Sequence, residues 1–366
     1  MDTSDLHITF DAHGVCDHCR SFVTHTQPHW PVLHDGKAQL ERMVERIQRA
    51  GRGQDFDCII GMSGGIDSSY LTYIAKEQLG LRPLVFHVDA GWNSQEAVNN
   101  IEKLVDGLGL DLFTEVIDWP EMQDLQLAYF KSGVPNIDTP QDHAFFATMY
   151  RFARQYQVKT ILTGANLSTE CVRNPIEWMY YQSDAVQLRA IHAHFGTRPL
   201  KKFPLTSILW HKIYLPYVHG IRVERPLNNI PYVKQEAMAT LIERFGWQPY
   251  PRKHFESRFT RFYESYWLYE RFGYDVRRVQ YSSLILTGQM TRAEALEALA
   301  EPPYDQQTIA HDQEFVAHKL GITSAQLDAY FHLPKRSYRD YPSQKWLYDF
   351  GAQAMKILGL EVGGKR

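Results

Sequence analysis

The chain has 366 residues, of which 44% are hydrophobic and 22% are charged, and its formal net charge is −3. This is the composition of a folded protein, but the chain is longer than the roughly 250–300 residues that one hydrophobic core supports, so we expect two domains or one domain with an extension. The charge excludes a globally basic nucleic-acid binder, and no apolar run reaches the roughly 18–20 residues that a membrane span needs.

Residues 1–55 are predicted to form a leader that ends in a helix. Leu40, Met43 and Ile47 recur at helical spacing, and Gly51 ends that helix. The N-terminus is acidic and has no apolar segment, so we expect no signal peptide. The chain has only four cysteines, too few for a disulfide scaffold at this length, which favours the reducing cytoplasm.

From residue 56 onward, short apolar runs alternate with amphipathic stretches, which predicts an α/β domain with a parallel sheet over residues 56–248. The predicted strands are 56–60, 83–88, 112–117, 159–163 and 221–224. The predicted helices are 67–79, 94–108, 121–131, 141–157 and 232–245, while residues 183–219 show a mixed pattern.

Residues 249–366 are predicted to form a mostly helical, aromatic-rich domain that packs on the sheet domain. Twelve aromatic side chains lie between Trp247 and Tyr281, and capping-box patterns begin at Thr291 and Thr323. The aromatic residues expected on one helical face are Phe255, Phe259, Phe262, Tyr263, Tyr266 and Trp267. Core packing is the leading interpretation; sugar or base stacking and single-stranded RNA binding are the alternatives, since basic residues interleave with the rings.

The segment Ser63-Gly-Gly-Ile-Asp-Ser-Ser69 lies between the first predicted strand and the first predicted helix of the sheet domain. Its glycines allow a ligand to approach the backbone, and the helix N-terminus and serine hydroxyls supply donors for a group the size of pyrophosphate. Asp67 fits such a site if it holds Mg²⁺ that bridges phosphate oxygens. The pattern is neither a Walker A loop nor a dinucleotide-binding fingerprint.

This segment resembles the loop of the PP-loop ATP pyrophosphatases, a Rossmann-like α/β superfamily that splits ATP into AMP and pyrophosphate. The resemblance implies that ATP binds at the carboxyl ends of the strands. The implied ATP-binding residues are Ser63, Gly64, Gly65, Asp67, Ser68 and Ser69 in the loop, His87, Val88 and Asp89 after the second strand, and Gly164 and Asn166 after the fourth.

Further segments are similar to the N-acetyl sugar amidotransferases of bacterial surface-polysaccharide, lipopolysaccharide O-antigen and nonulosonic-acid biosynthesis. They are Ile8-Thr-Phe-Asp11, Gly14-Val-Cys-Asp-His-Cys19, the stretch 57–70, His254-Phe255, Arg258-Phe-Thr-Arg261, Phe272-Gly-Tyr-Asp275 and the stretch 282–292. The resemblance implies adenylation of an N-acetyl oxygen, after which ammonia attacks the carbon and AMP leaves to give an acetamidino sugar. Glu170 is the candidate base for the incoming ammonia.

The expected substrate is a nucleotide-linked and therefore anionic sugar. The candidate anion-binding residues are Arg173, Lys201, Lys202, Arg225, Arg258 and Arg261. No nucleophile elbow with cysteine appears, and Met1-Asp2 excludes an N-terminal cysteine nucleophile, so ammonia is expected from a separate glutaminase partner similar to the glutaminase and cyclase of histidine biosynthesis.

The alternative is a PP-loop tRNA-modifying enzyme. A thiolase needs catalytic cysteines near ATP, whereas Cys58 is expected inside the first strand and Cys171 has no partner in the sequence. The weak basic balance also argues against tRNA, so we do not expect a nucleic-acid partner.

Cys16 and Cys19 have the spacing of a structural zinc knuckle, but zinc takes four ligands. The family that the chain resembles usually carries a second Cys-x-x-Cys just upstream, which this sequence lacks. Either the natural protein is longer or other residues complete the site; the available donors are His13, His18, His25, His34 and His254. The alternative is a metal-free leader with two free thiols.

Overall fold

A computed structural model describes residues 1–357 and contains a five-stranded sheet with the strand order β3-β2-β1-β4-β5. Neighbouring strands are all parallel, with Ile59 of β1 in register with Leu84 of β2 and Ile161 of β4. This confirms the predicted α/β class. The strands are β1 (Cys58–Gly61), β2 (Pro83–Asp89), β3 (Leu112–Val116), β4 (Thr160–Leu162) and β5 (Arg222–Glu224).

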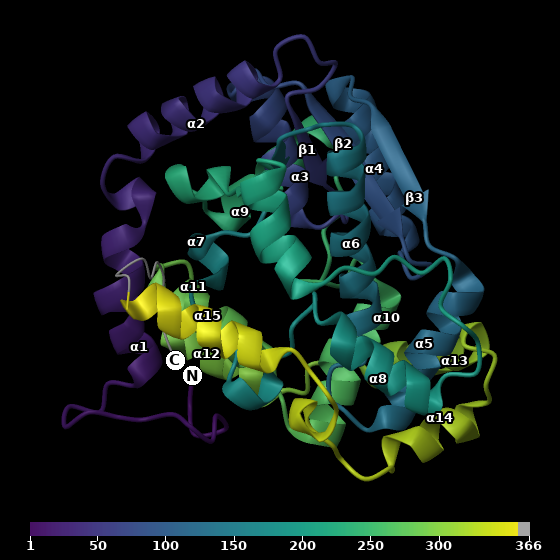
Figure 1. The fold of residues 1–366 in the computed structure, drawn as a ribbon. Helices are drawn as coiled ribbons and strands as arrows, with labels where there is room; N and C mark the ends of the chain where they lie inside the picture. Colours follow the sequence, from purple (N-terminus) through teal and green to yellow (C-terminus); the bar gives the residue numbers. More distant parts are fainter. Residues whose placement is uncertain (358–366) are drawn as a thin grey trace.

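Helices cover both faces of the sheet (Figure 1). Side chains alternate across a strand, so Cys58 and Ile60 of β1 enter one core while Ile59 enters the other. The first core is closed by α2 (Gly36–Ala50), α3 (Ile66–Tyr73), α4 (Gln95–Leu108) and α9 (Lys234–Phe245). The second core is closed by α5 (Trp119–Ser132), α6 (Thr139–Gln155) and α8 (Ala185–Phe195), together with C-terminal residues.

The described C-terminal third is helical, as predicted, and the capping boxes at Thr291 and Thr323 both form. Its helices are α10 (Arg258–Phe262), π-helical turns over Tyr263–Phe272, α11 (Arg277–Leu286), α12 (Arg292–Ala300), α13 (Gln306–Lys319), α14 (Ser324–Phe331) and α15 (Lys345–Ile357).

The aromatic block packs into the core that it shares with the sheet. Phe259, Phe262 and Trp267 are almost fully buried there, beside β2 and α5. Burying one such side chain contributes about 1.5–3 kcal/mol, so the aromatic block holds the C-terminal helices on the sheet. One detail of the prediction is wrong: Phe255 precedes the helix and does not share its face, because the chain still forms a turn there.

The N-terminal leader contains α1 (Asp17–Ser21) and a run of short turns that leads to α2. Its first residues contact α11: the Met1 amine donates a hydrogen bond to Ser282, and Asp2 pairs with Arg278. Figure 1 shows the leader (purple) beside the C-terminal helices. Within residues 1–357, no helix is long and apolar enough to cross a membrane.

Candidate ATP and substrate site

The segment predicted to bind phosphate connects β1 directly to α3. Gly64 has a φ of +84°, a left-handed conformation that glycine adopts without strain. The Ser63 hydroxyl accepts a hydrogen bond from the Gly65 amide at 3.2 Å, and the Ser68 hydroxyl donates to the Gly65 carbonyl at 3.2 Å. The turn therefore directs amides and hydroxyls of the α3 N-terminus toward one point, which suits a phosphate.

A second turn, after β4, lies directly against this helix start. A β-carbon at Gly164 would lie 2.7 Å from the carbonyl carbon of Asp67 and 2.8 Å from the amide nitrogen of Ser68. Only a residue without a side chain allows this approach. The contact fixes the ends of β1 and β4 relative to each other, so residues predicted on both turns belong to one site.

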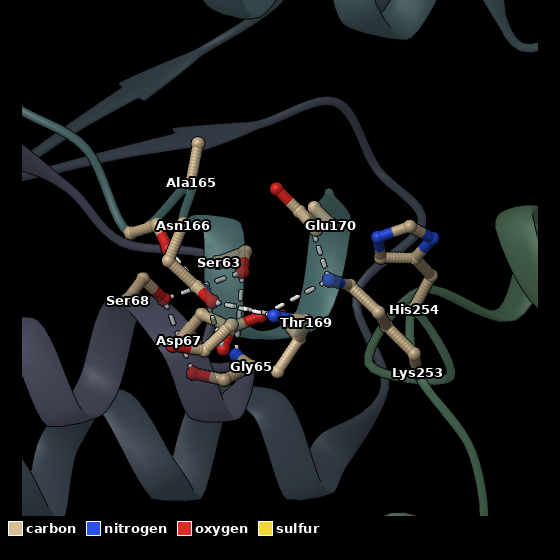
Figure 2. A network of polar contacts seen from close by, with 12 residues as sticks. Ser63, Gly65, Asp67, Ser68, Ala165, Asn166, Thr169, Glu170, Lys253 and His254 are labelled. Atoms are coloured by element: carbon tan, nitrogen blue, oxygen red, sulfur yellow. Dashed lines mark hydrogen bonds and ion pairs between the residues drawn. The ribbon is translucent and has the colours of Figure 1, made fainter. Parts of the chain in front are cut away.

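Asp67 is the centre of a polar network (Figure 2). Its Oδ1 accepts hydrogen bonds from the Tyr232 hydroxyl at 2.6 Å and from the Asn166 amide at 3.3 Å. Its Oδ2 lies 3.2 Å from the Lys253 ammonium. Burial alone would raise the pKa of this carboxyl, but Lys253 and Tyr232 outweigh burial and hold the pKa of Asp67 below its ordinary value.

Lys253 joins the two residues that the sequence singled out for chemistry. Its ammonium lies between Asp67 and Glu170, 2.5 Å from the Glu170 carboxylate (Figure 2). Burial opposes the charge, but the two carboxylates raise the pKa of Lys253 above its ordinary value, so it is a cation at neutral pH. Glu170 itself ends α7 (Leu167–Glu170) and is more than a third exposed.

A cavity of about 360 Å³, which we call the loop cavity, opens over these residues. Lys234, Arg252 and Lys253 line the loop cavity together with the serines of residues 63–69. Burial lowers the pKa of Lys234. Such a mixture of backbone amides, hydroxyls and cations is the donor set that phosphate groups need. Its lining includes Ser63, Gly65, Asp67, Ser68, Thr163, Gly164, Glu170, Lys234, Arg252, Lys253 and Glu256.

Mg²⁺ is usually held by one or two carboxylates together with substrate phosphates. Asp67 and Glu256 face the loop cavity, and the Glu256 carboxylate accepts a hydrogen bond from the Ser63 hydroxyl at 3.2 Å. These two residues fit Mg²⁺ bound together with a nucleotide. Within the described residues, no group of three or more His, Cys, Asp or Glu is arranged to hold a metal by itself.

A second cavity of about 480 Å³, the strand-end cavity, adjoins the loop cavity and shares Ser63, Thr163, His254 and Glu256 with it. His87 and Val88 line it at the end of β2. His87 is fixed by hydrogen bonds from Nδ1 to the Met62 carbonyl at 2.8 Å and between Nε2 and the Asn93 amide at 2.9 Å. His87 and Val88, both predicted to bind ATP, therefore lie beside residues 63–69, the predicted phosphate loop.

The far side of the strand-end cavity is acidic. Burial raises the pKa of both Asp138 and Asp142, and each hydrogen-bonds a hydroxyl, Thr260 and Tyr180 respectively. Facing them, His254 Nδ1 lies 2.8 Å from the Glu264 carboxylate.

His254 stands between the two cavities in a left-handed backbone conformation, with a φ of 65°. Burial opposes its charge, but the Glu264 carboxylate raises the pKa of His254 to about 9. His254 therefore carries a proton at neutral pH beside the predicted reaction centre.

Four predicted ATP-binding residues line neither cavity: Gly64, Ser69, Asp89 and Asn166. Ser69 is completely buried on the core side of α3. Asp89 accepts hydrogen bonds from the Gly91 amide at 2.7 Å and from Asn93 at 3.3 Å, which fixes the turn after β2. The Asn166 side-chain amide donates a hydrogen bond to the Asp67 carboxylate. Its side-chain oxygen accepts a hydrogen bond from the Thr169 backbone amide and so caps α7.

The structure separates the predicted substrate-binding residues. Arg173 lines a third cavity, described below. Arg258 and Arg261 both donate hydrogen bonds to the fully buried Asp312 of α13 at 2.6–3.1 Å, so the two guanidinium groups share one carboxylate.

The two predicted lysines also lie outside the cavities. The backbone amides of Lys201 and Lys202 donate to Glu121, and the Lys202 ammonium pairs with Asp118 at 3.1 Å.

Cys16 and Cys19 lie close together, with their sulfurs 3.4 Å apart, and burial with the Cys16 contact raises the pKa of Cys19 to about 11. His18 does not join them, because its ring is buried against Asp5 at 2.9 Å. The described residues therefore offer two thiols and no further ligands, which does not fit a four-ligand zinc site.

Sequence reasoning missed several residues of the site. Tyr232, Lys234 and Glu256 carry no local signal, since each becomes functional only when the chain folds back onto the loop. Lys253 had a weak signal, because it stands in the basic and aromatic block after Gly246. His254 was named only as a possible zinc ligand and as part of the family resemblance, not as a residue of this site.

Residues 256–355 match the family described as "LPS biosynthesis protein WbpG-like, C-terminal domain". Residues 256–355 are therefore similar to the C-terminal domain of WbpG-like proteins, and we call this segment the WbpG-like domain. The matched segment begins at Glu256, whose carboxylate accepts a hydrogen bond from the Ser63 hydroxyl. The WbpG-like domain therefore starts inside the site just described.

A stretch of 123 residues is 30% identical to the tRNA-specific 2-thiouridylase MnmA 2 of Fusobacterium nucleatum subsp. nucleatum, covering 31% of this chain and 34% of that protein. The chain thus spans about a third of the length of this curated relative.

Solved structures with partial similarity include NMN synthetase from Francisella tularensis, with a TM-score of 0.33 and 16% identity over 79% of this chain and 98% of that one. The U34-tRNA thiolase NcsA from Methanococcus maripaludis, with its [4Fe-4S] cluster, has a TM-score of 0.36 and 13% identity over 77% and 80%. The NH3-dependent NAD synthetase of Campylobacter jejuni has a TM-score of 0.29 and 15% identity over 60% and 100%.

Proposed function

We propose that this protein is an ATP-dependent, AMP-forming amidotransferase that converts the acetamido group of a nucleotide-linked sugar into an acetamidino group. The observation that supports the proposal is the loop cavity. There the phosphate loop of the α/β domain lies beside Glu256 of the WbpG-like domain and beside Lys253 and His254 of the segment before it. A nucleotide-activating loop is thereby joined to a domain of the lipopolysaccharide-biosynthesis type.

In the proposed reaction the amide oxygen of the N-acetyl group attacks the α-phosphorus of ATP, and pyrophosphate leaves. The product of this step is an O-adenylated imidate. Ammonia then adds to the imidate carbon, the carbon–oxygen bond breaks, and AMP departs with the former amide oxygen. One proton released from the nitrogen passes to a base.

The residues have separate tasks in this proposal. Ser63, Ser68 and the α3 amides hold the phosphates, and Lys253 neutralises charge that develops as pyrophosphate leaves. Asp67 with Glu256 would hold Mg²⁺, which lowers the repulsion between the triphosphate and the attacking oxygen. Glu170 and the acids of the strand-end cavity are the candidates for the proton acceptor.

The decisive experiment incubates the purified chain with ATP, Mg²⁺, ammonium and a panel of nucleotide-linked N-acetyl sugars. We expect AMP, pyrophosphate and a product in which NH replaces oxygen, detected by mass spectrometry. Formation of ADP and orthophosphate, or consumption of ATP without a change in any sugar, would contradict the proposal.

The ammonia source is proposed to be a separate glutaminase with an ammonia-channelling subunit, because the reaction needs nitrogen and the sequence shows no glutaminase signature. We therefore expect the purified chain to work with high ammonium and not with glutamine. Efficient use of glutamine by this chain alone would rule out the partner.

A tRNA-modifying enzyme is the second candidate, favoured by the identity to the 2-thiouridylase. Its chemistry needs a reactive thiol, and burial raises the pKa of both Cys58 and Cys171, the latter to about 11. Cys171 also donates its thiol hydrogen to the Ser283 carbonyl. Incorporation of sulfur into bulk tRNA by the purified chain with ATP and a sulfur donor would favour this candidate over the amidotransferase.

A further inference from the structure

A third cavity of about 760 Å³, which we call the tyrosine groove, lies beyond the strand-end cavity. The two share Phe146, Asn174, Tyr180 and Gln182, so a molecule bound in the groove can reach toward the phosphate loop. Its size suits an organic ligand, since such pockets are usually about 300–1,000 Å³.

The groove is rich in positive charge that nothing in the described chain neutralises. Its two acids are already engaged, Glu177 with His7 and Asp349 with Lys345 at 2.6 Å. Within residues 1–357, Arg173 and Lys212 line the groove without an ion pair or a side-chain hydrogen bond, and Arg339 lines it without an ion pair. Arg336 donates to the Tyr341 hydroxyl and lies near Asp340.

Arg225 adds to this charge from outside the groove. Desolvation, and then the nearby charge of Arg225, lowers the pKa of both Arg173 and Lys212, although both side chains reach solvent. Arg225 thus lies within electrostatic reach of both Arg173 and Lys212, and none of the three forms an ion pair with a described residue. A bound anion would relieve the repulsion between these cations. The arginine guanidinium group can bind two phosphate oxygens at once.

The groove also offers flat surfaces. Tyr181 and Tyr348 stack with ring centroids 3.8 Å apart, and Tyr338 packs against Tyr181 edge-on at 5.4 Å. Aromatic side chains of this kind stack on nucleobases without selecting one base strongly. The combination of cations, stacked rings and a passage to the loop fits one chemical class of ligand.

We infer that the tyrosine groove binds the nucleoside diphosphate part of the sugar substrate, with the diphosphate on Arg173 and Lys212 and the base against the tyrosines. This rests on the proposed function and adds to it a nucleotide site separate from that of ATP. The sugar then extends past Tyr180 and Gln182 into the strand-end cavity, where its acetamido group meets the loop.

Calorimetric titration of the full chain with UDP, GDP and dTDP, each in the presence of saturating ATP and Mg²⁺, tests the inference. At least one diphosphate is expected to bind without displacing ATP. The double variant Arg173→Gln/Lys212→Gln should weaken that binding at least about tenfold while leaving ATP affinity unchanged, because each lost charged hydrogen bond contributes substantially.

Two further variants guard against misfolding and against a general loss of charge. Arg173→Lys/Lys212→Arg keeps both charges and should retain most of the binding. Lys37→Gln/Arg49→Gln removes the same charges from the exposed face of α2, where neither residue lines a cavity, and should bind as the unaltered chain does.

Unchanged diphosphate binding in the Gln double variant, competition between the diphosphate and ATP, or no binding of any diphosphate would overturn the inference. Binding of bulk tRNA that is lost in the same variant, with no diphosphate bound, would assign the groove to RNA instead. The proposed function and the groove inference can fail separately. If a diphosphate binds as expected but no amidino product forms, the proposed function is wrong and the groove inference stands. If product forms and the double variant has an unchanged KM for the sugar substrate, the groove inference is wrong and the proposed function stands.

Discussion

Gly164→Ala tests whether the contact between the two turns positions the phosphate loop. The new methyl group would lie 2.7 Å from the Asp67 carbonyl carbon, whereas ordinary contact begins near 3.4 Å, so the turns must separate by about 0.7 Å. Both neighbouring atoms belong to the backbone of α3, which cannot move aside as a flexible side chain would.

Two effects of different size follow from this displacement. Overpacking costs about 1–3 kcal/mol, which lowers the melting temperature by only a few degrees in a chain of this length. Misplacement of reacting groups by about 1 Å costs about 100-fold in rate, so AMP formation should fall by about 10- to 100-fold.

The assay follows AMP release under saturating ATP, with thermal melting of the same preparations. Gly351→Ala is the matched control, because Gly351 lies in α15 with no atom within 4 Å of the added carbon. A Gly164→Ala variant with unchanged melting temperature and with turnover within about twofold of the unaltered chain would refute the reasoning, since the two turns would then not need their close contact.

The other predictions concern charge. Asp67→Asn should lower AMP-forming turnover by at least about 100-fold while circular dichroism stays unchanged, because it removes the carboxylate that faces Lys253 and the nucleotide; turnover close to that of the unaltered chain would contradict the role of Asp67. The His254–Glu264 pair should stabilise the fold fully below pH 6.5 and lose its contribution as the pH rises through about 9, since the pKa of His254 is raised above its ordinary value of 6.5; thermal melts between pH 6 and pH 10 should show this decline, and Glu264→Gln should flatten it. Asp312→Asn should cost about 3–5 kcal/mol in urea unfolding, because Arg258 and Arg261 lose a fully buried counter-charge; a cost below about 1 kcal/mol would show that water compensates the two guanidinium groups.

The sequence predicted the elements whose cause is local. Every predicted strand is present, with bounds that agree within about two residues. Short apolar runs signal the buried strands β1, β2 and β4, while the edge strands β3 and β5 are more exposed. The turn at residues 63–69 was also predicted at a strand–helix junction, because Gly64 and its neighbours form a local turn. Such features need no knowledge of distant contacts.

The pairing of charges could not be predicted in this way. Arg258 and Arg261 look like anion-binding residues in the sequence, yet both donate to the same carboxylate, that of Asp312, more than fifty positions later. Lys212 gave no signal, although it lines the tyrosine groove without an acidic partner among the described residues. Whether a cation is free or matched depends on long-range contacts, which periodicity and spacing do not encode.

The predicted boundary between residues 248 and 249 divides the chain in sequence but runs through the site in space. The Ser94 amide donates to the Glu256 carbonyl, and the Arg258 amide donates to the Trp92 carbonyl, each at 2.9 Å. These hydrogen bonds tie the start of the WbpG-like domain to the turn before α4, next to the loop. Removing residues 249–366 would take Lys253 away from Asp67 and expose the core that Phe259 and Trp267 fill. The α/β domain alone would therefore lack both the counter-charge of Asp67 and part of its own core, so we expect the two parts of the chain to fold as one unit.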